Sequence, residues 1–308
     1  MFLLLRLLSK CPLRLLHAVG AMAGWLTFWA SPTYRRRYRA NVAQAGLAWS
    51  AVSDGVAAAG RMIAELPWLW LRPPGTPLGE RVRWDGAELI EQALQDRRGL
   101  VLMTPHLACF EICAQAYAER FAESANAPIT VLFRPARQAW LREVVDGSRG
   151  RPGLETAPAN LAGVRQMIRA LRQGHTIGLL PDQVPPEGLG VWAPFFGHPA
   201  YTMTLASRLL QQTGARALLI WGERLEKGQG FVVHVRPGPE IGRELTPESA
   251  ALHINRSMEE LILQAPSQYL WGYHRYKQPR GLDIGAAPTA VPAPAAGPAA
   301  GPVVESER

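Results

Sequence analysis

Cysteine is scarce in this chain of 308 residues. The three cysteines, Cys11, Cys109 and Cys113, are an odd number and lack the spacing of a zinc site. So small a set argues against a disulfide framework and favours a reducing compartment for the bulk of the chain. His, Cys and carboxylate residues nowhere cluster at ligand spacing, so we expect no metal and no cofactor.

Charged residues are few as well: they make up 19% of the chain, against 48% hydrophobic residues. This balance is apolar for a soluble protein but too charged for a polytopic membrane protein. The net charge of +8 predicts anionic partners, and charge alone does not separate nucleic acid from acidic lipid. Because the basic residues are mostly arginines scattered among tryptophan, leucine and proline, without a nucleic-acid-reading motif, we expect a membrane lipid and no nucleic acid.

The N-terminal segment contains a long run without formal charge. Residues 15–34 have only His17 as a weakly basic side chain, and about 20 apolar residues suffice for a helix to cross a bilayer. Two arrangements fit: a spanning helix, or a helix lying in the membrane interface. In the second, three basic residues lie at the water line: Arg6, Lys10 and Arg14. We interpret residues 1–40 as a membrane anchor, and the arginines at 35–39 predict that the rest is cytoplasmic.

Apolar strands alternate with helices through the middle of the chain. Strands are predicted at 99–105, 129–134, 176–181, 215–222 and 230–236, and helices at 49–72, 87–97, 160–174, 202–214 and 246–264. Strands that are apolar throughout indicate a sheet covered on both faces. We therefore predict an α/β fold with a mixed, mostly parallel sheet covered by helices, following an N-terminal membrane-anchoring helix.

The end of the chain has a different composition. From about residue 285 it is rich in alanine, proline and glycine, which cannot build a hydrophobic core. We predict a disordered tail over residues 285–308, which leaves residues 41–284 as the one catalytic domain.

His106 and Glu111 are the residues on which we expect the chemistry to depend. His106 follows an apolar strand that ends at Pro105, and Glu111 lies in the first turns of the next helix, within reach of the imidazole. A carboxylate on one ring nitrogen fixes the tautomer, so that the other nitrogen can take a proton from a hydroxyl. Two alternatives stay open: His106 is an ordinary core or surface histidine, or Cys109 is a thiol nucleophile. The helical spacing of Cys109 and Cys113 is typical of small buried residues.

Six ordered sequence blocks carry a resemblance to a known family. They are Trp84–Glu88, Thr104–Glu111, Phe133–Pro135, Gly178–Gln183, Ala193–Gly197, and Tyr269–Trp271 with Arg275–Lys277. Residues 82–277 resemble the lipid A late acyltransferases, the lauroyl and myristoyl transferases of Gram-negative inner membranes, within the lysophospholipid acyltransferase superfamily. One departure is Ala108-Cys109-Phe110, where the family often has Gly-Asn-Trp.

The resemblance implies acyl transfer from an acyl carrier protein thioester to a hydroxyl of a lipid A precursor or related anionic glycolipid. The reaction would occur at the cytoplasmic face of the inner membrane, with His106 as general base and Glu111 as its partner. Four further residues are expected to bind substrate: Arg134 and Asp182, which match family blocks, and Arg149 and Arg151, whose guanidinium forks suit anionic headgroups.

Two other functions stay open on the sequence. The acceptor could be a lysophospholipid or an ornithine-type lipid in place of a lipid A precursor. From a different class, the chain could be a non-catalytic, basic membrane-binding protein that kept the fold and lost the reaction. The intact His106–Glu111 pair weighs against the second possibility.

Overall fold

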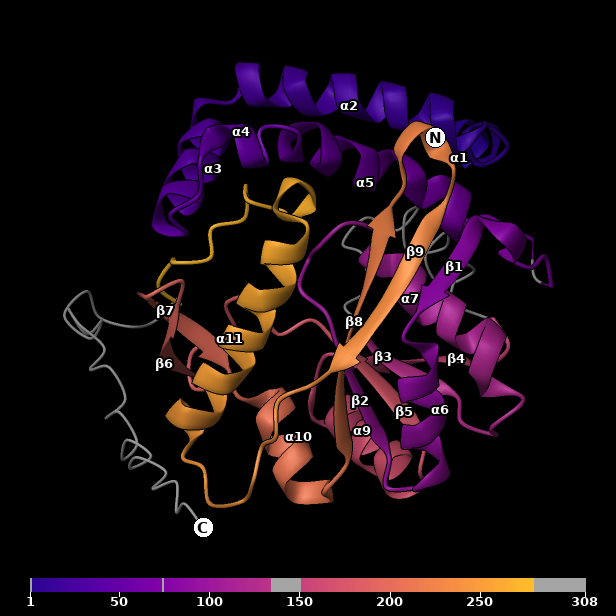
Figure 1. Cartoon of the computed structure of the whole chain (residues 1–308), viewed down its shortest axis with the longest axis vertical. Helices are drawn as coiled ribbons and strands as arrows, with labels where there is room; N and C mark the ends of the chain where they lie inside the picture. Colours follow the sequence, from indigo (N-terminus) through magenta and orange to yellow (C-terminus); the bar gives the residue numbers. More distant parts are fainter. Residues whose placement is uncertain (1, 74, 134–150, 280–308) are drawn as a thin grey trace, which may run out of the picture.

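A computed structural model describes residues 2–73, 75–133 and 151–279 (Figure 1). The predicted tail at 285–308 and two of the predicted substrate-binding residues, Arg134 and Arg149, lie outside this described part.

The centre of the molecule is a seven-stranded sheet in the order β1-β9-β8-β2-β5-β3-β4 (Figure 1). Its strands are β1 (Val82–Asp85), β2 (Leu100–Met103), β3 (Ile129–Phe133), β4 (Leu154–Pro158), β5 (Thr176–Leu179), β8 (Arg216–Arg224) and β9 (Phe231–Pro237). All neighbouring strands are parallel except β8 and β9, which are antiparallel. The predicted mixed, mostly parallel sheet is therefore confirmed.

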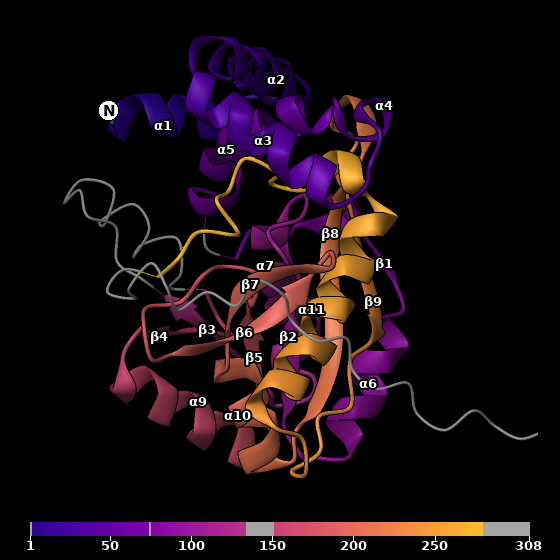
Figure 2. The ribbon, with the colours of Figure 1, turned by 90° about the vertical axis from the view of Figure 1, so that its left-hand side faces the viewer.

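Helices cover both faces of this sheet (Figure 2). They are α6 (Ala87–Gln95) and α7 (Phe110–Tyr117) on one face, and α9 (Leu161–Arg172), α10 (Leu205–Thr213) and α11 (Pro247–Gln264) on the other. In β2, Leu100 and Leu102 pack toward the first pair, whereas Val101 and Met103 pack toward the other three. Since successive side chains point to opposite faces, a strand buried on both sides must be apolar at every position.

Four strands escaped the sequence prediction: β1, β4 and the separate antiparallel hairpin of β6 (Gly190–Phe195) and β7 (His198–Met203). The helix predicted at 202–214 begins only at Leu205, because Thr202 and Met203 still belong to β7. The hairpin turn is formed by Phe196 and Gly197, with φ of 46° and 74°. Positive φ at both turn residues suits the twist of a two-residue hairpin, but phenylalanine is a rare residue there, so the signal was weak.

Residues 2–70 form five helices at one end of the sheet (Figures 1 and 2). They are α1 (Phe2–Ser9), α2 (Leu13–Ala30), α3 (Pro32–Gln44), α4 (Trp49–Val52) and α5 (Gly55–Trp70). Helices α2 and α5 pack closely at Gly20 and Gly60. Gly60 lies so near the carbonyl oxygen of Gly20 that a Cβ atom at residue 60 would collide with it. The end they cover is the carboxyl edge of the parallel strands, since α2 contacts the turn that follows β8.

The uncharged segment 15–34 is divided between two helices, unlike the single spanning helix that was one predicted arrangement. Helix α2 ends at Ala30, and Ser31 caps α3 by accepting a hydrogen bond from the Tyr34 amide (3.3 Å). Pro32 has no amide hydrogen with which to continue α2. Across the described ranges, no helix combines the length and the apolar character needed to cross a bilayer. Residue 40, where we placed the end of the anchor, lies within α3.

A buried ion network joins these helices to the sheet. Glu65 of α5 accepts two hydrogen bonds from Arg224 at the end of β8 (2.7 and 2.5 Å) and contacts His17 Nε2 of α2 at 3.0 Å. Burial opposes ionisation of Glu65, but the charges and hydrogen bonds of Arg224 and His17 outweigh it, so its pKa lies below the ordinary value. The network therefore contributes stability at neutral pH and loses it as acid protonates Glu65.

We predict that breaking this pair from one side unfolds the protein more easily than removing both partners. Glu65→Met leaves Arg224 buried without its carboxylate, and Arg224→Met leaves the buried Glu65 with His17 alone. Each change should cost about 3–5 kcal/mol, whereas the double variant should lose much less than the sum. Urea unfolding of the three variants measures this. Arg61→Met is the control, because the Arg61–Asp54 pair is partly exposed and worth no more than about 1 kcal/mol. Additive losses in the double variant would contradict the prediction.

Candidate active site

The register of two parallel strands brings His106 and Asp182 together. Met103 at the end of β2 is paired with Leu179 at the end of β5. His106 and Asp182 each follow three residues later, so both leave the carboxyl edge of the sheet at the same height. His106 Nδ1 lies 2.7 Å from Asp182 Oδ1, and the His106 amide donates to Asp182 Oδ2 at 2.9 Å. The carboxylate that holds this imidazole is thus one that we had expected to bind substrate.

Asp182 is almost fully buried and is well supplied with donors. Besides its two bonds from His106, it accepts a hydrogen bond from the Tyr269 hydroxyl at 3.3 Å. Burial opposes ionisation, but the charge of His106, its two hydrogen bonds and the charge of Arg275 outweigh it, so the pKa of Asp182 lies below its ordinary value. The group facing His106 Nδ1 is therefore a carboxylate, and it fixes the proton on that nitrogen.

The second ring nitrogen of His106 faces an amide. Gln183 Nε2 lies 3.0 Å from His106 Nε2. An amide N–H can only donate, so it is matched to the tautomer with the proton on Nδ1 and a lone pair on Nε2. The His106 side chain is about one-sixth exposed, at 17%.

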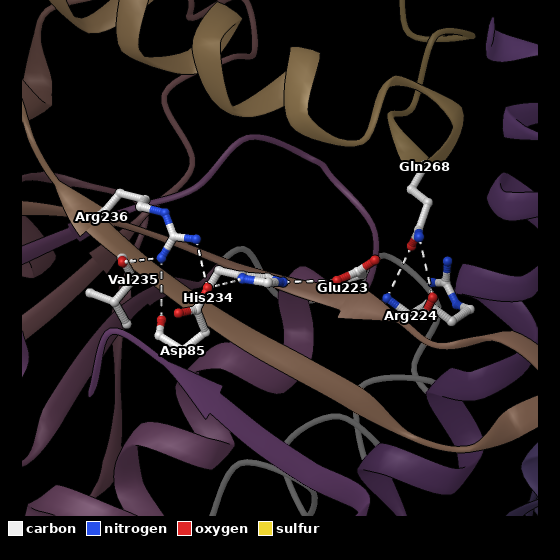
Figure 3. A network of polar contacts seen from close by, with 7 residues as sticks. All are labelled: Asp85, Glu223, Arg224, His234, Val235, Arg236 and Gln268. Atoms are coloured by element: carbon white, nitrogen blue, oxygen red, sulfur yellow. Dashed lines mark hydrogen bonds and ion pairs between the residues drawn. The ribbon is translucent and has the colours of Figure 1, made fainter. Parts of the chain in front are cut away.

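Another histidine, His234 of β9, shows a different arrangement (Figure 3). Its Nδ1 and Nε2 each lie 2.8 Å from a carboxylate, of Asp85 and Glu223 respectively, and its ring stacks on Trp221. Since both ring nitrogens face carboxylates, which can only accept hydrogen bonds, neither nitrogen of His234 is placed to meet a substrate hydroxyl. It links β1, β8 and β9.

The loop that carries His106 is held from both sides. On one side the Cys109 amide donates to Gly222 O of β8 at 2.9 Å. On the other, the Ala108 amide donates to Gln268 O (2.9 Å), and Gln268 in turn bonds both backbone groups of Arg224 (Figure 3). Ala108 has φ of 52°, a left-handed conformation that costs about 1–2 kcal/mol for a residue other than glycine. This is the position at which the resembling family often has glycine.

Glu111 lies in the first turn of α7, as predicted. Its Oε2 accepts a hydrogen bond from Trp70 Nε1 of α5 at 3.4 Å. Phe110, the residue before Glu111, packs edgewise against the imidazole of His106, with ring centroids 4.9 Å apart. The first turn of α7 thus lies against the imidazole, and the direct pairing of Glu111 with His106 stays a prediction.

The structure also shows residues that the sequence had not singled out. Gln183 and Tyr269 complete the surroundings of His106 and Asp182, and both lie in blocks on which the resemblance rests. Arg275, from the last block, is 2% exposed and bonds Tyr201 O and the Thr202 hydroxyl of β7. It anchors the hairpin. Among the described residues, no three His, Cys, Asp or Glu side chains converge to hold a metal, and the expectation of a metal-free protein stays a prediction.

Cys109, the alternative nucleophile, is buried. It is 1% exposed, and burial together with the charge of Glu65 raises the pKa of its thiol well above the ordinary value. Because the thiolate is the nucleophilic form, the structure disfavours Cys109 as a nucleophile.

We predict that thiol reagents distinguish the three cysteines. In the native protein, maleimide should modify Cys11, which is partly exposed, and should leave the buried Cys109 and Cys113 unmodified until the chain is unfolded. Mass spectrometry of the peptides measures this, and Cys11→Ser is the control that should abolish the native reaction. Fast native labelling of Cys109 would restore the thiol mechanism.

Comparison with known proteins places these features in a family. Residues 1–278 match the family described as bacterial lipid A biosynthesis acyltransferase. Among curated relatives, the lipid A biosynthesis palmitoleoyltransferase of Escherichia coli K12 is 24% identical over 69% of this chain and 66% of the relative, just under two thirds of its length. The lipid A biosynthesis lauroyltransferase of the same organism is 26% identical over 72% and 70%. A lipid A biosynthesis acyltransferase of Haemophilus influenzae is 23% identical over 63% and 58%. The chain therefore belongs to the bacterial lipid A biosynthesis acyltransferase family.

Proposed function

We propose that this protein is an O-acyltransferase that moves a fatty acyl chain from an acyl carrier protein thioester to a hydroxyl of a lipid A precursor. The observation that carries the proposal is the imidazole of His106, which has a buried carboxylate on Nδ1 and the neutral amide of Gln183 at Nε2. The relatives' names, which include palmitoleoyl and lauroyl transferases of lipid A biosynthesis, support the acceptor class and favour it over a lysophospholipid.

In the proposed reaction, His106 Nε2 takes the proton of the acceptor hydroxyl while its oxygen attacks the thioester carbonyl carbon. The hydroxyl displaces the amide of Gln183, which occupies the same lone pair in the structure. As the tetrahedral intermediate collapses, the C–S bond breaks and the imidazolium returns the proton to the leaving thiolate. A thioester is already activated, so a base and charge stabilisation suffice without an enzyme nucleophile.

Two carboxylates have separate parts in this proposal. Asp182 holds Nδ1–H, which orients the ring and stabilises the imidazolium that forms. Glu111 is retained as the second carboxylate at the ring, because the first turn of α7 lies against the imidazole. Its negative charge close to a developing cation lowers the energy of the charged intermediate.

We further propose that α2 attaches the protein to the inner membrane from the cytoplasmic side by lying in the interface. Five apolar residues at alternating spacings of four and three form one exposed stripe on this helix: Leu15, Val19, Met22, Leu26 and Trp29, each between 47% and 67% exposed. The opposite face of α2 is buried on the protein. Exposed basic residues lie at both ends of the stripe: Arg6, Lys10, Arg14, Arg36, Arg37 and Arg39. An apolar stripe bordered by arginine fits a surface of anionic lipid.

We predict that the imidazole and its carboxylates act as one unit. His106→Ala should lower kcat by roughly 10²–10⁴. Asp182→Asn should cost a comparable factor because it permits the wrong tautomer, and the double variant should be little worse than either single variant. Glu111→Gln should also lower kcat. The measurement is acyl transfer from acyl carrier protein to a purified lipid A precursor.

His234→Ala is the matched control, because both of its ring nitrogens face carboxylates outside the site. It should keep most of the activity if it remains folded by circular dichroism. Near-normal turnover by His106→Ala would rule out the proposed mechanism, and absence of transfer by the wild-type protein would rule out the proposed substrates.

We predict that the stripe on α2 controls membrane binding. The triple variant Leu15→Ser/Met22→Ser/Leu26→Ser should lose at least tenfold in affinity, since burying each large apolar side chain is worth about 1.5–3 kcal/mol. Co-sedimentation with vesicles containing phosphatidylglycerol measures this. Leu161→Ser, at an exposed residue of α9 (77% exposed), is the control and should bind as the wild type does. Unchanged sedimentation of the triple variant would show that another surface binds the lipid.

A further inference from the structure

Two arginines lie side by side at the end of α5, close to the proposed catalytic residues. Arg72 lies two residues beyond the last residue of α5, and Arg151 lies three residues before β4. Arg151 Nη2 donates to the carbonyl oxygens of Leu69 (3.1 Å) and Arg72 (2.8 Å), and so caps the end of the helix. Arg72 Nη2 donates to Gln115 Oε1 of α7 at 3.1 Å. These bonds use one nitrogen of each guanidinium.

Three further nitrogens of this described pair are buried without a hydrogen bond. Within the described ranges, Arg72 Nε and Nη1 and Arg151 Nε are inaccessible to solvent and make no hydrogen bond. The Arg72 side chain is more than nine-tenths buried, at 8% exposure. Burying an unpaired polar group of this kind costs roughly 1–3 kcal/mol or more. Three such nitrogens are therefore unexpected in a purely structural contact.

The charges in this cluster do not balance. In the described part of the chain, one carboxylate, Glu119, lies near the two guanidinium groups. It is 3.8 Å from Arg72 Nη1, beyond hydrogen-bonding distance. Both Glu119 oxygens already accept the Leu78 amide (2.9 and 2.8 Å). Burial and the charge of Arg151 lower the pKa of Arg72 to about 10, with Glu119 opposing the shift. Among the described residues, this cluster therefore carries one positive charge in excess, which favours an anion.

We propose that Arg72 and Arg151 form a phosphate-binding subsite of the acyltransferase. A phosphate group offers several acceptor oxygens, and the planar guanidinium fork binds phosphate with two parallel N–H···O bonds. One anion could therefore accept from Arg72 Nη1 and from the second hydrogen of Nη2, of which Gln115 takes one, and neutralise the like-charged pair. Which molecule supplies the phosphate rests on the proposed function. The binding of phosphate by Arg72 and Arg151 does not.

The position of the pair relates the subsite to the reaction. Trp70 bonds Glu111, and Arg72, two residues further, bonds Gln115. Glu111 and Gln115 are four residues apart on α7, about 6 Å along the axis. A phosphate at Arg72 would thus lie about one helical turn from Glu111, close enough to position the molecule that reacts there. Both substrates of the proposed reaction carry phosphate, the acceptor on its sugar and the donor in its phosphopantetheine arm.

Thermal unfolding of the full-length protein in detergent tests binding without any assay of activity. Inorganic phosphate in the millimolar range is compared with chloride at equal ionic strength. At about ten times its Kd, phosphate should raise the Tm of the wild type by about 2 °C. Arg72→Gln and Arg151→Gln should abolish this phosphate-dependent rise, and Arg72→Lys should keep part of it, because it retains the charge without the fork.

Arg120→Gln is the matched control. Arg120 lies one residue beyond Glu119, pairs with Glu91 and is 43% exposed, so its loss should leave the phosphate response unchanged. A wild-type Tm that responds equally to phosphate and chloride would overturn the proposal, as would an equal response in all variants. If Arg72→Gln does not fold, Arg151→Gln carries the same test.

Kinetics then identify which substrate supplies the phosphate. If it belongs to the acceptor, Arg72→Gln should raise the KM for the acceptor about 10- to 100-fold. With an acceptor that has been dephosphorylated beforehand, the wild type and Arg72→Gln should have the same KM. If it belongs to the donor arm, the KM for the acyl carrier protein thioester should rise by that factor instead. A variant that loses only kcat, with both KM values unchanged, would count against a binding role even if phosphate stabilises the protein.

Discussion

The candidate site depends on the pairing register of β2 and β5. Parallel strands in register leave the sheet at the same height, so His106 and Asp182, each three residues beyond a paired position, meet without a long loop. The apolar side chains of β2 fix that register from both faces, because a shift by one residue would exchange the two cores that its alternate residues fill. The geometry of the imidazole is therefore set by the packing of the sheet more than by contacts within the site.

The N-terminal helices complete this arrangement from above the carboxyl edge. Glu65 and Arg224 connect α5 to β8, and Gly222 of the same strand receives the amide of Cys109 in the loop after His106. The end of α5 also supplies Trp70 to Glu111. His17 of α2, within the predicted anchor 1–40, contacts the same Glu65 at 3.0 Å, so that segment is part of this packing as well. The exposed stripe of α2 would bring a membrane surface to the same end of the molecule at which the proposed reaction takes place.

The sequence was informative where burial dictates residue type. The fully apolar strands at 99–105 and 176–181, the Asn160 cap and the helix from Pro247 to Gln264 were all located by pattern. The partner of His106 was not, because a carboxylate 76 residues away becomes a neighbour only through strand pairing, whereas Glu111 is close in sequence. The pairing of Arg72 with Arg151 was missed for the same reason. The β6–β7 hairpin escaped because its turn contains Phe196 in a conformation that usually marks glycine or asparagine.

The difference between His106 and His234 shows which feature separates a proposed general base from a histidine that only links strands. His106 and His234 each have partners at both ring nitrogens, and each has a carboxylate at Nδ1. They differ at Nε2: His234 faces Glu223, whereas His106 faces the amide of Gln183. A carboxylate at that nitrogen requires N–H there and leaves no base. An amide donor keeps the lone pair in place, and because the amide is neutral, a substrate hydroxyl can replace it without leaving an unpaired charge behind. The residue after Asp182 is therefore as important to the proposed chemistry as Asp182 itself.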